Sequence, residues 1–483
     1  MNGCVLVVDV GTSGLRAAVV DHQGQVVTLH HREVPPTSPA PLFVEFDPAA
    51  MAAAALDVAR AALAEAGPVD AVGIANQRSS TVLWDRATGQ PVGPGVSWQD
   101  LRTAGMCLML QAQGVRLAPN ESATKLAFLL DLADPERERD LCFGTIETWM
   151  AWTLSEGAVH ITEPTNAALT GLFRLDGSGW DPAVAGALRV PEAVLPEIVG
   201  SAAVSGVASA LPGSPPIAGM AGDQQASLIG QGCTRTGQAK LTFGTGGMLD
   251  ICLGAQRPPF PRVGPAGTFP IVAWGIGGHL TWGLEAAMLS AGQAVGWLRD
   301  DLGIITTAAE SEEVAGACRD SGGVVFVPAL GGLGAPVWDF GARGTLLGLA
   351  RGTGRPEIVR AVLEGVAHRA VDLVEAAEAD SGLPIGTLRV DGGMTANSVF
   401  VQALADAAQR PVEVSRVREA TTLGAAFLAG VAVGLWSGLD ECASLWAPGH
   451  TIEPYRRLDR DRWREARDRS LRWVPELSAL EFF

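Results

Sequence analysis

The sequence predicts an α/β protein built from two domains. Short runs of β-branched and apolar residues alternate with helical stretches rich in alanine and leucine, which is typical of α/β proteins. At 483 residues, the chain is several times longer than one hydrophobic core usually requires, so two domains are expected. Residues 8–14 and 241–247 also resemble each other weakly, because each is an apolar run that ends in Gly-Thr and small residues. Each domain is therefore expected to open with a strand and a tight turn.

The predicted elements follow the chain in order. Strands are predicted for four apolar runs, at residues 5–10, 17–20, 71–74 and 82–84. Residues 48–66 predict a surface helix instead of a membrane span, because three charged residues are spaced to share one exposed face: Asp57, Arg60 and Glu65. Residues 201–216 are rich in small residues and proline, and the apolar run 217–222 follows them. We place the domain boundary here and predict domains 1–222 and 223–483.

The composition narrows the classes of binding partner and the cellular compartment that we expect for the protein. The net charge of −17 argues against binding to nucleic acid or to an anionic membrane, since either needs a clustered basic surface. The seven cysteines are scattered without metal-ligand spacing, which favours reduced thiols in the cytoplasm. No basic segment followed by a long apolar run precedes the first strand, so no secretion signal is expected. The expected partner is a small molecule, and a homo-oligomer is compatible with the sequence.

The first candidate site is the turn after the first predicted strand. Asp9 precedes this turn, Gly11, Thr12 and Ser13 form it, and Arg16 follows it. An acid, turn amides, hydroxyls and a cation within one strand-turn-strand unit suit phosphate and metal chemistry, with Asp9 on Mg²⁺ and Arg16 near the phosphate charge. A surface hairpin with a hydrogen-bonded Asp9 explains the segment equally well.

Two further segments place polar residues at the end of an apolar run. Asp223 and Gln224 follow the run 217–222, where they suit a general base and a substrate-orienting amide. The simpler alternative is that Asp223 caps the next helix. Residues 390–397 read Val-Asp-Gly-Gly-Met-Thr-Ala-Asn, a predicted strand ending in a glycine pair that a nucleotide can approach closely. An ordinary strand-to-helix turn is the alternative there, because the GxGxxG spacing is absent.

These segments, in their order along the chain, resemble the FGGY carbohydrate kinases over nearly the whole sequence. The resemblance extends to residues 73–78 with Trp84 and Asp85, residues 97–103 around Trp98, residues 143–146, and the run 344–364, which matches the C-terminal signature of the family. The nearest motifs are those of its glycerol kinases. The resemblance implies an α/β fold of two ribonuclease H-like (actin-like ATPase) domains with an interdomain cleft.

The same resemblance implies transfer of the γ-phosphoryl group of ATP, with Mg²⁺, to a hydroxyl of a small polyol or sugar. It implies Asp223 as the general base and Asp9 as the metal-associated carboxylate. The implied substrate contacts are Gln77, Arg78, Trp98, Asp223 and Gln224. The implied phosphate and nucleotide contacts are Gly11, Thr12, Ser13, Arg16, Thr245, Gly331, Gly393 and Asn397. A catalytically weak, actin-like nucleotide-binding sensor is the alternative, although a sensor needs no general base.

Three positions depart from the glycerol kinase pattern. Ser79 stands where the resemblance leads us to expect a glutamate, Asn120 where we expect a tyrosine, and Met248 where we expect an aromatic wall. We therefore predict retained chemistry with altered acceptor recognition, in which Asn120 or Glu121 bonds the extra hydroxyls of an acceptor with four or five carbons. The alternative is that the protein is a weak glycerol kinase in which these three residues have drifted without a change of acceptor.

Overall fold

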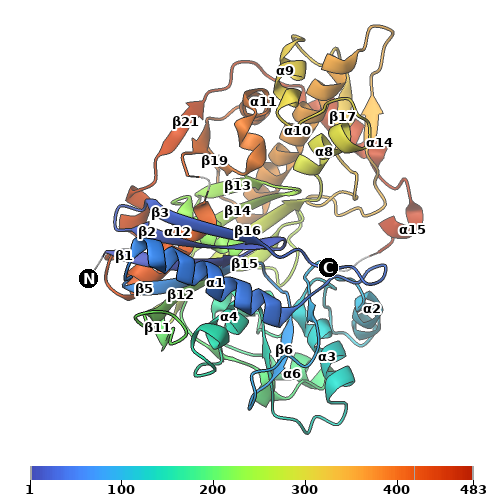
Figure 1. Cartoon of the computed structure of the whole chain (residues 1–483). Coiled ribbons are helices and arrows are strands. Elements are labelled where there is room, and N and C mark those ends of the chain that lie inside the picture. Colours follow the sequence, from blue (N-terminus) through green and yellow to red (C-terminus); the bar gives the residue numbers. More distant parts are fainter. Residues whose placement is uncertain (1–2, 418, 481–483) are drawn as a thin grey trace.

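In the computed structural model, the described residues, 3–417 and 419–480, form two large mixed sheets (Figure 1). The six-stranded sheet has the order β11 (Ala202–Val207), β12 (Pro216–Gly222), β5 (Ala71–Asn76), β1 (Cys4–Val10), β2 (Gly14–Asp21) and β3 (Val26–Glu33). The seven-stranded sheet has the order β15 (Phe269–Ile276), β16 (His279–Met288), β14 (Gly247–Gly254), β13 (Ala239–Phe243), β19 (Leu388–Asp391), β20 (Val412–Ser415) and β21 (Pro448–Ile452).

The two sheets share the pairing of five strands. In the first, β3, β2 and β1 form an antiparallel meander, and β5 and β12 continue the sheet parallel to β1. In the second, β16, β14 and β13 are likewise antiparallel neighbours, and β19 and β20 continue the sheet parallel to β13, but β15 lies between β14 and β16 in the chain and pairs at the edge beyond β16. This repeated arrangement agrees with the predicted α/β fold of two ribonuclease H-like units.

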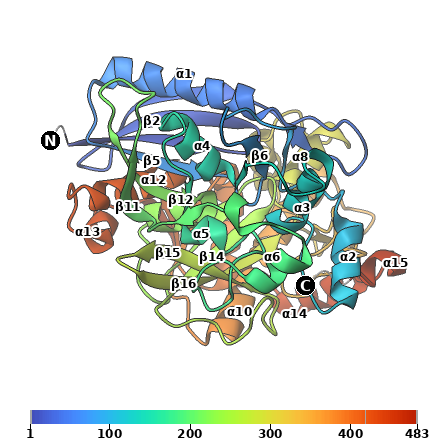
Figure 2. The same cartoon turned by 90° about the horizontal axis from the view of Figure 1, so that it is seen from below.

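Strand β1 is buried on both faces because its side chains alternate between two cores. Leu6 and Val8 pack with α1 (Pro48–Ala66) and α4 (Ile146–Leu154), whereas Val5 and Val7 pack with α12 (Ala420–Ala432). Figure 2 shows α1 running along one side of the sheet. The helix begins after Asp47, whose carboxylate accepts the N–H groups of the first turn, and its bounds confirm the predicted surface helix.

Helices α7 (Asp223–Gly230) and α12 pack against each other between the two sheets. A Cβ atom on Gly230 would lie 1.9 Å from the carbonyl oxygen of Ala420, and one on Gly424 would lie 1.8 Å from that of Ala226. Only glycine permits this contact of two backbones. Helix α12 therefore returns from the C-terminal half to cover the first sheet, and the element that begins with Asp223 lies at the centre of the protein.

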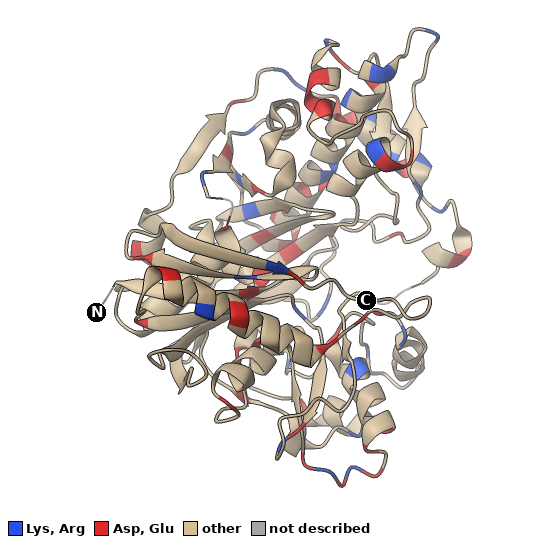
Figure 3. Ribbon diagram, viewed as in Figure 1, with Lys and Arg blue, Asp and Glu red and all other residues tan. Residues whose placement is uncertain are grey.

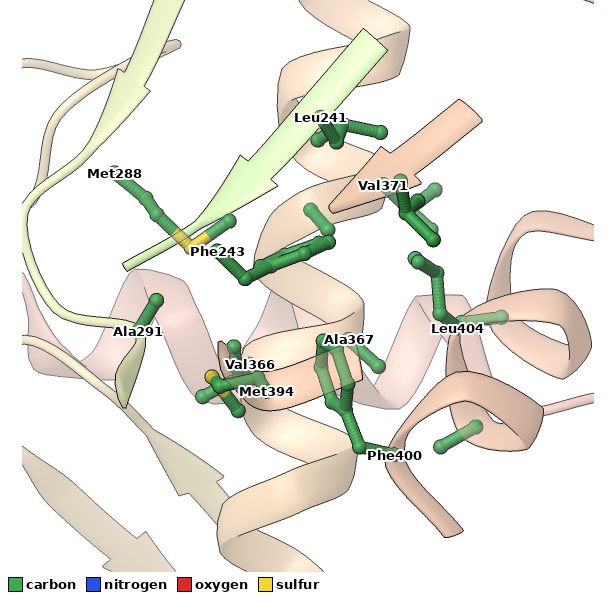
Figure 4. Close-up of a cluster of buried hydrophobic side chains, with 14 of the residues drawn as sticks. Leu241, Phe243, Met288, Ala291, Val366, Ala367, Val371, Met394, Phe400 and Leu404 are labelled. Carbon is green, nitrogen blue, oxygen red and sulfur yellow. The ribbon is translucent and has the colours of Figure 1, made fainter. Parts of the chain in front are cut away.

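The core of the second half fixes the end of β13. Figure 4 shows Phe243, the last residue of β13, packed beside Phe400 of α11 (Ser398–Ala408), and the two ring centroids lie 4.9 Å apart in an edge-to-face arrangement. Val366 and Ala367 of the long helix α10 (Arg355–Ser381) belong to the same cluster. The turn after β13 therefore starts from a rigid position.

Shorter elements complete the structure. Those in the first half are β4 (Glu45–Phe46), β6 (Val82–Asp85), β7 (Gly95–Val96), α2 (Ala104–Ala112), α3 (Ser122–Ala133), β8 (Leu141–Gly144), β9 (Ile161–Thr162), α5 (Pro164–Ala167), α6 (Pro182–Ala187), η1 (Glu192–Val194) and β10 (Glu197–Ile198). Those in the second half are α8 (Gly292–Asp300), α9 (Glu310–Gly316), β17 (Val325–Val327), β18 (Thr345–Leu347), η2 (Gly393–Ala396), α13 (Leu439–Ser444), α14 (Arg460–Ser470) and α15 (Pro475–Ser478).

Within the described part of the chain, no helix has both the length and the apolar character needed to span a bilayer. Acidic and basic residues are scattered along the ribbon of both halves (Figure 3).

The four predicted strands and both predicted tight turns are confirmed. β1 and β2 pair as an antiparallel hairpin around residues 11–13, and β13 and β14 pair around residues 244–246. Part of the small-residue stretch before the predicted domain boundary forms β11, at the edge of the first sheet, so this stretch is not an extended connector. The chain then passes from the first sheet to the second through α7.

Candidate active site

Three parallel strands of the first sheet end in one row. Val10 of β1 lies opposite Asn76 of β5, and Asn76 lies opposite Gly222 of β12. The next residues along each strand are Gly11, Gln77 with Arg78, and Asp223. Ligands of open α/β sheets bind beyond the carboxyl ends of the strands, so the register alone brings three predicted site segments to a ligand-binding edge.

The turn between β1 and β2 is narrow, and charged side chains lie beside it. The N–H of Gly11 donates to the carbonyl of Gly14 at 2.9 Å. Asp9 lies opposite Arg16 in the hairpin, with Arg16 Nε 3.5 Å from its carboxylate, and Arg16 also forms a close ion pair with Glu419. Arg16 is therefore held by two acids beside the turn, where it can also approach a phosphate.

Asp9 has the environment of a carboxylate that binds a cation. The pKa of Asp9 is raised to about 6: burial is the largest cause, Arg16 opposes it, and the negative charges of Asp223 and Glu419 add to it. A divalent cation beside Asp9 would remove this electrostatic penalty, so the site fits Mg²⁺. Among the described residues, no cluster of three or more acids, histidines or cysteines is arranged to hold a metal. The fit is thus to a Mg²⁺ ion with one or two protein carboxylates and with phosphate and water as its other ligands.

Arg78 joins Asp223 to the second sheet. Its Nε lies 3.4 Å from Asp223 Oδ1, and one terminal nitrogen lies 2.6 Å from Glu285 Oε2 on β16. Burial lowers the pKa of Arg78, but the charges of Glu285 and Asp223 more than offset this effect and raise it overall. A Cβ on Gly222 would lie 2.8 Å from the side chain of Arg78, so the glycine before Asp223 gives the arginine its room.

Asp223 is the first residue of α7, and it is not the cap. Gly222 occupies the capping position, and Asp223 Oδ1 accepts the N–H of its neighbour Gln224 at 2.8 Å. The capping alternative for Asp223 is therefore wrong. Burial raises the pKa of this carboxyl, while Arg78 and the Gln224 N–H lower it. About a third of the side chain, 32%, stays exposed, so the carboxylate can reach a bound molecule.

Gln224 is fixed by a buried charge pair that sequence reasoning missed. Lys240 Nζ donates to Gln224 Oε1 at 2.5 Å and lies 2.8 Å from Asp250 Oδ2, and both charged side chains are fully buried. Lys240, Asp250 and Glu285 are direct cross-strand neighbours on β13, β14 and β16. A lysine and two acids in three separate strands give no local pattern, and only the register reveals the cluster.

Gln77 and Trp98 hold the turn from two sides. Gln77 is buried; its Nε2 donates to the carbonyl of Gly11 at 3.2 Å, and its Oε1 accepts the Ser80 hydroxyl at 3.1 Å. Trp98 is 40% exposed, and its Nε1 donates to Thr12 Oγ1 at 3.0 Å. The indole is therefore available to a ligand, whereas the Gln77 amide is already used within the protein.

A cavity of about 920 Å³ lies in the C-terminal half. Thr245 lines it from the β13–β14 turn, and Gly393 and Asn397 line it from the segment between β19 and α11. Residues of α8 and the α8–α9 segment also line it: Gln293, Trp297, Arg299 and Ala308. Leu330 also lines the cavity, and Gly331 follows it in the chain. The volume lies at the upper end of the range for small-molecule sites.

Asn397 caps the N-terminus of α11. Its Oδ1 caps the helix by accepting the N–H of Phe400 at 3.0 Å, and its Nδ2 donates to Ser311 at 3.0 Å. Gly392 takes a φ of +93°, and a Cβ there would lie 2.3 Å from the carbonyl of Phe243. The predicted strand, glycine pair and helix are thus present, and the first glycine is the one that the packing requires.

The three altered pocket positions have different surroundings. Ser79 is buried with a φ of +62°, and its hydroxyl donates to the carbonyl of Leu169 at 3.0 Å. Asn120 is exposed and Met248 is half-buried. Glu121, the neighbour of Asn120, is paired with Arg262 of the second half at 3.2 Å. Ser79 and Glu121 are thus engaged within the protein, and Asn120 has the free side chain.

Known proteins match both halves of the chain. Residues 4–230 match the N-terminal domain, and residues 240–433 the C-terminal domain, of the family described as "FGGY family of carbohydrate kinases". A glycerol kinase of Aromatoleum aromaticum is 42% identical, with 97% of this chain and 99% of the relative covered. Glycerol kinase 2 of Thermotoga maritima gives the same identity and coverage.

Solved structures give the same result. Plasmodium falciparum glycerol kinase with ADP superposes with a TM-score of 0.89 at 28% identity, over 97% of this chain and 98% of the other. A structure described as a "xyloylose kinase" from Brucella ovis superposes with a TM-score of 0.85 at 25% identity, over 99% of this chain and all of the other.

Proposed function

The chain belongs to the FGGY family of carbohydrate kinases, and on that premise we propose that Asp223 is the general base of an ATP-dependent phosphotransferase that acts on a small polyol or sugar. One observation carries the assignment of the base. Asp223 is a partly exposed carboxylate with a raised pKa, and it lies beside Arg78 at the row where three parallel strands end. A carboxylate whose pKa is shifted towards neutral pH is a better proton acceptor for a hydroxyl.

Acceptor binding is proposed for the side chains around this carboxylate. Arg78 can donate to an acceptor hydroxyl while Glu285 holds its other end, and Gln224 can donate through the amide nitrogen that Lys240 leaves free. The exposed indole of Trp98 offers an apolar wall. Gln77 is proposed to support the turn at Gly11, because its own amide is occupied, and it is no longer assigned a direct substrate contact.

Nucleotide binding is proposed for the 920 Å³ cavity, with Thr245, Gly393 and Asn397 as contacts and Gly331 as the neighbour in sequence of the lining residue Leu330. The phosphates would extend towards Gly11, Thr12, Ser13 and Arg16. Mg²⁺ held by Asp9 would neutralise charge on the transferred phosphoryl group. The protein itself supplies alignment, the turn amides and the base, which are the main requirements of phosphoryl transfer.

Three further expectations belong to the same proposal. The chain divides into domains 1–222 and 223–483, and limited proteolysis with and without ATP tests this division. The protein works in the cytoplasm, which the seven free cysteines favour. Sedimentation velocity tests the expected homo-oligomer.

An acceptor panel tests the function. ADP formation is measured with ATP, Mg²⁺ and glycerol, erythritol, ribitol, xylitol, ribulose or xylulose. Loss of one hydrogen bond to a charged group costs roughly 1.5–3 kcal/mol, or about 10- to 150-fold in kcat/KM, so glycerol should be a poor acceptor and a four- or five-carbon acceptor the best. If glycerol gives the highest kcat/KM of the panel, the residues at the three altered positions do not change which acceptor is preferred. ADP formation that no acceptor stimulates would contradict the kinase assignment.

A further inference from the structure

The carboxylate of Glu163 lies fully buried behind the row of strand ends, with five donors around it. Its Oε1 accepts the Thr165 hydroxyl at 2.5 Å, the Asn166 N–H at 2.8 Å and Asn166 Nδ2 at 3.0 Å. Its Oε2 accepts the Thr165 N–H at 3.0 Å and the Ser201 hydroxyl at 2.6 Å. Capping of the short helix α5 explains the two backbone bonds, and it leaves the three side-chain bonds unexplained.

The first side-chain bond leads to Asp223. Thr165 Oγ1 accepts the N–H of Gly222 at 2.9 Å, and Gly222 is the residue immediately before Asp223. The backbone N–H of Gly222 can only donate, so Thr165 Oγ1 is the acceptor in that bond and the Thr165 hydroxyl proton is directed to Glu163. Glu163 thereby fixes the Thr165 hydroxyl as the acceptor that holds the start of α7.

The second side-chain bond leads to Arg78. Asn166 Nδ2 donates to Asn76 Oδ1 at 3.0 Å, and Asn76 Nδ2 donates back to Asn166 Oδ1 at 2.9 Å. Asn76 Nδ2 also donates to the carbonyl of Gln77, which precedes Arg78. The bond from Asn166 Nδ2 to Glu163 fixes which end of the Asn166 amide is the donor, and at the other side of the pair Asn76 Nδ2 also donates to Glu147 Oε2 at 3.1 Å, so a buried carboxylate orients each amide.

The third side-chain bond connects Glu163 to the C-terminal half. The Ser201 hydroxyl donates to Glu163 and accepts the N–H of Gly275 on β15 at 2.9 Å, while the Ser201 N–H donates to the Gly275 carbonyl at 2.7 Å. One carboxylate therefore orders three polar side chains, and each of these holds a different backbone segment.

We propose that Glu163 is a positioning residue of the kinase reaction, which sets Asp223 through Thr165 and Gly222 and sets Arg78 through Asn166 and Asn76. The inference rests on the roles proposed above for Asp223 and Arg78. All the side chains of this relay are fully buried, so they touch no substrate and act only through the two backbone segments. A displacement of reacting groups by about 1 Å can cost ~10²-fold in rate, which sets the scale of the expected effect.

The test breaks the relay at Glu163 itself and then at Thr165, with a second buried threonine of the same segment as the control. Glu163→Gln keeps the size of the side chain but replaces one accepting oxygen with an NH2 group, so it should lower kcat as Thr165→Val does, and an unchanged kcat would overturn the proposal. Thr165→Val removes the hydroxyl that holds Gly222, and Thr165→Ser keeps it. Thr170→Val is the matched control, because the Thr170 hydroxyl is equally buried but bonds only to Ala167 and Leu172. Thr165→Val should lower kcat by roughly 10- to 100-fold with the Kd for ATP unchanged within about twofold, whereas Thr165→Ser and Thr170→Val should stay within about threefold of the unmodified protein.

A double-mutant cycle distinguishes positioning from general destabilisation. If Thr165 acts through Asp223, Thr165→Val should cost less than about threefold when added to Asp223→Asn. The proposal is overturned if Thr165→Val loses no more activity than Thr170→Val, or if its loss is undiminished in the Asp223→Asn background. Should Thr165→Val not fold, Thr165→Ala removes the hydroxyl without adding volume and enters the same comparisons. Full activity of Asp223→Asn by itself would refute the proposed base, a result separate from both outcomes.

Discussion

Replacing Asp223 with asparagine isolates its role as a base. Asparagine has the same shape, and its carbonyl oxygen can still accept the Gln224 N–H that Asp223 Oδ1 now accepts at 2.8 Å. Arg78 lies 3.4 Å from Asp223 but only 2.6 Å from Glu285, so the guanidinium keeps its stronger partner. The site should therefore keep its geometry, and the proton acceptor is the group that is lost.

The expected loss in kcat is ~10²–10⁴-fold, the usual contribution of a general base, which corresponds to about 3–5 kcal/mol in activation free energy. ADP release is followed in a coupled assay with the best acceptor of the panel, and calorimetry measures the Kd for ATP, which should not change. Asp406→Asn is a control, because this buried carboxylate of α11 binds Arg456 and lies outside the row of strand ends. A kcat for Asp223→Asn within tenfold of the unmodified protein would refute the reasoning.

Two other predictions concern the cation and the glycine pair. The pKa of Asp9 is raised to about 6, so its charge develops as the pH rises through that value; the affinity for Mg²⁺ should increase roughly fivefold from pH 5 to 6 and roughly tenfold from pH 5 to 7, where it levels off, and Asp9→Asn should abolish this dependence. A Mg²⁺ titration that is the same for both proteins would show that Asp9 is structural. Gly392→Ala should lower stability by about 1–3 kcal/mol because its φ is +93° and its Cβ would meet the carbonyl of Phe243. Gly393→Ala meets open space, so it should leave Tm unchanged and weaken ATP binding. Equal Tm values for the two variants would contradict the packing argument.

Local patterns were sufficient for the elements that the chain builds from neighbouring residues. The helix at Pro48–Ala66 has a cap, a proline start and one exposed face, and both tight turns carry small residues between apolar strands. These features depend on a few consecutive residues, so the sequence contains all the information needed to predict them.

The buried charges could not be predicted in the same way. Lys240, Asp250 and Glu285 become neighbours only when three strands take their register, and Glu163 reaches Ser201 across 38 residues of sequence. The return of α12 to the first sheet is a further long-range feature, since its apolar sequence fits any buried position. The string Thr-Glu-Pro-Thr-Asn at residues 162–166 carries a signal of its own, because an acid followed by Pro, Thr and Asn is typical of a helix start. That signal indicates a cap, and only the structure shows the bonds to Gly222 and Asn76.

The segment around Asp223 is held by bonds from both halves of the protein, which restricts how the halves can move relative to each other. Thr165 fixes the preceding residue from the first half, Arg78 approaches the carboxylate from the same half, and Lys240 fixes the following residue from the second half. Helix α7 also packs on α12 through glycines that leave no space for sliding. If the halves move when ligands bind, α7 and α12 must therefore move as one body, and the displacement has to be taken up elsewhere. Ser201 and Gly275 join the halves at the far end of the same relay, so a rotation that separates them would remove the N–H that the Ser201 hydroxyl accepts, while the bond from Ser201 to Glu163 would stay within the first half.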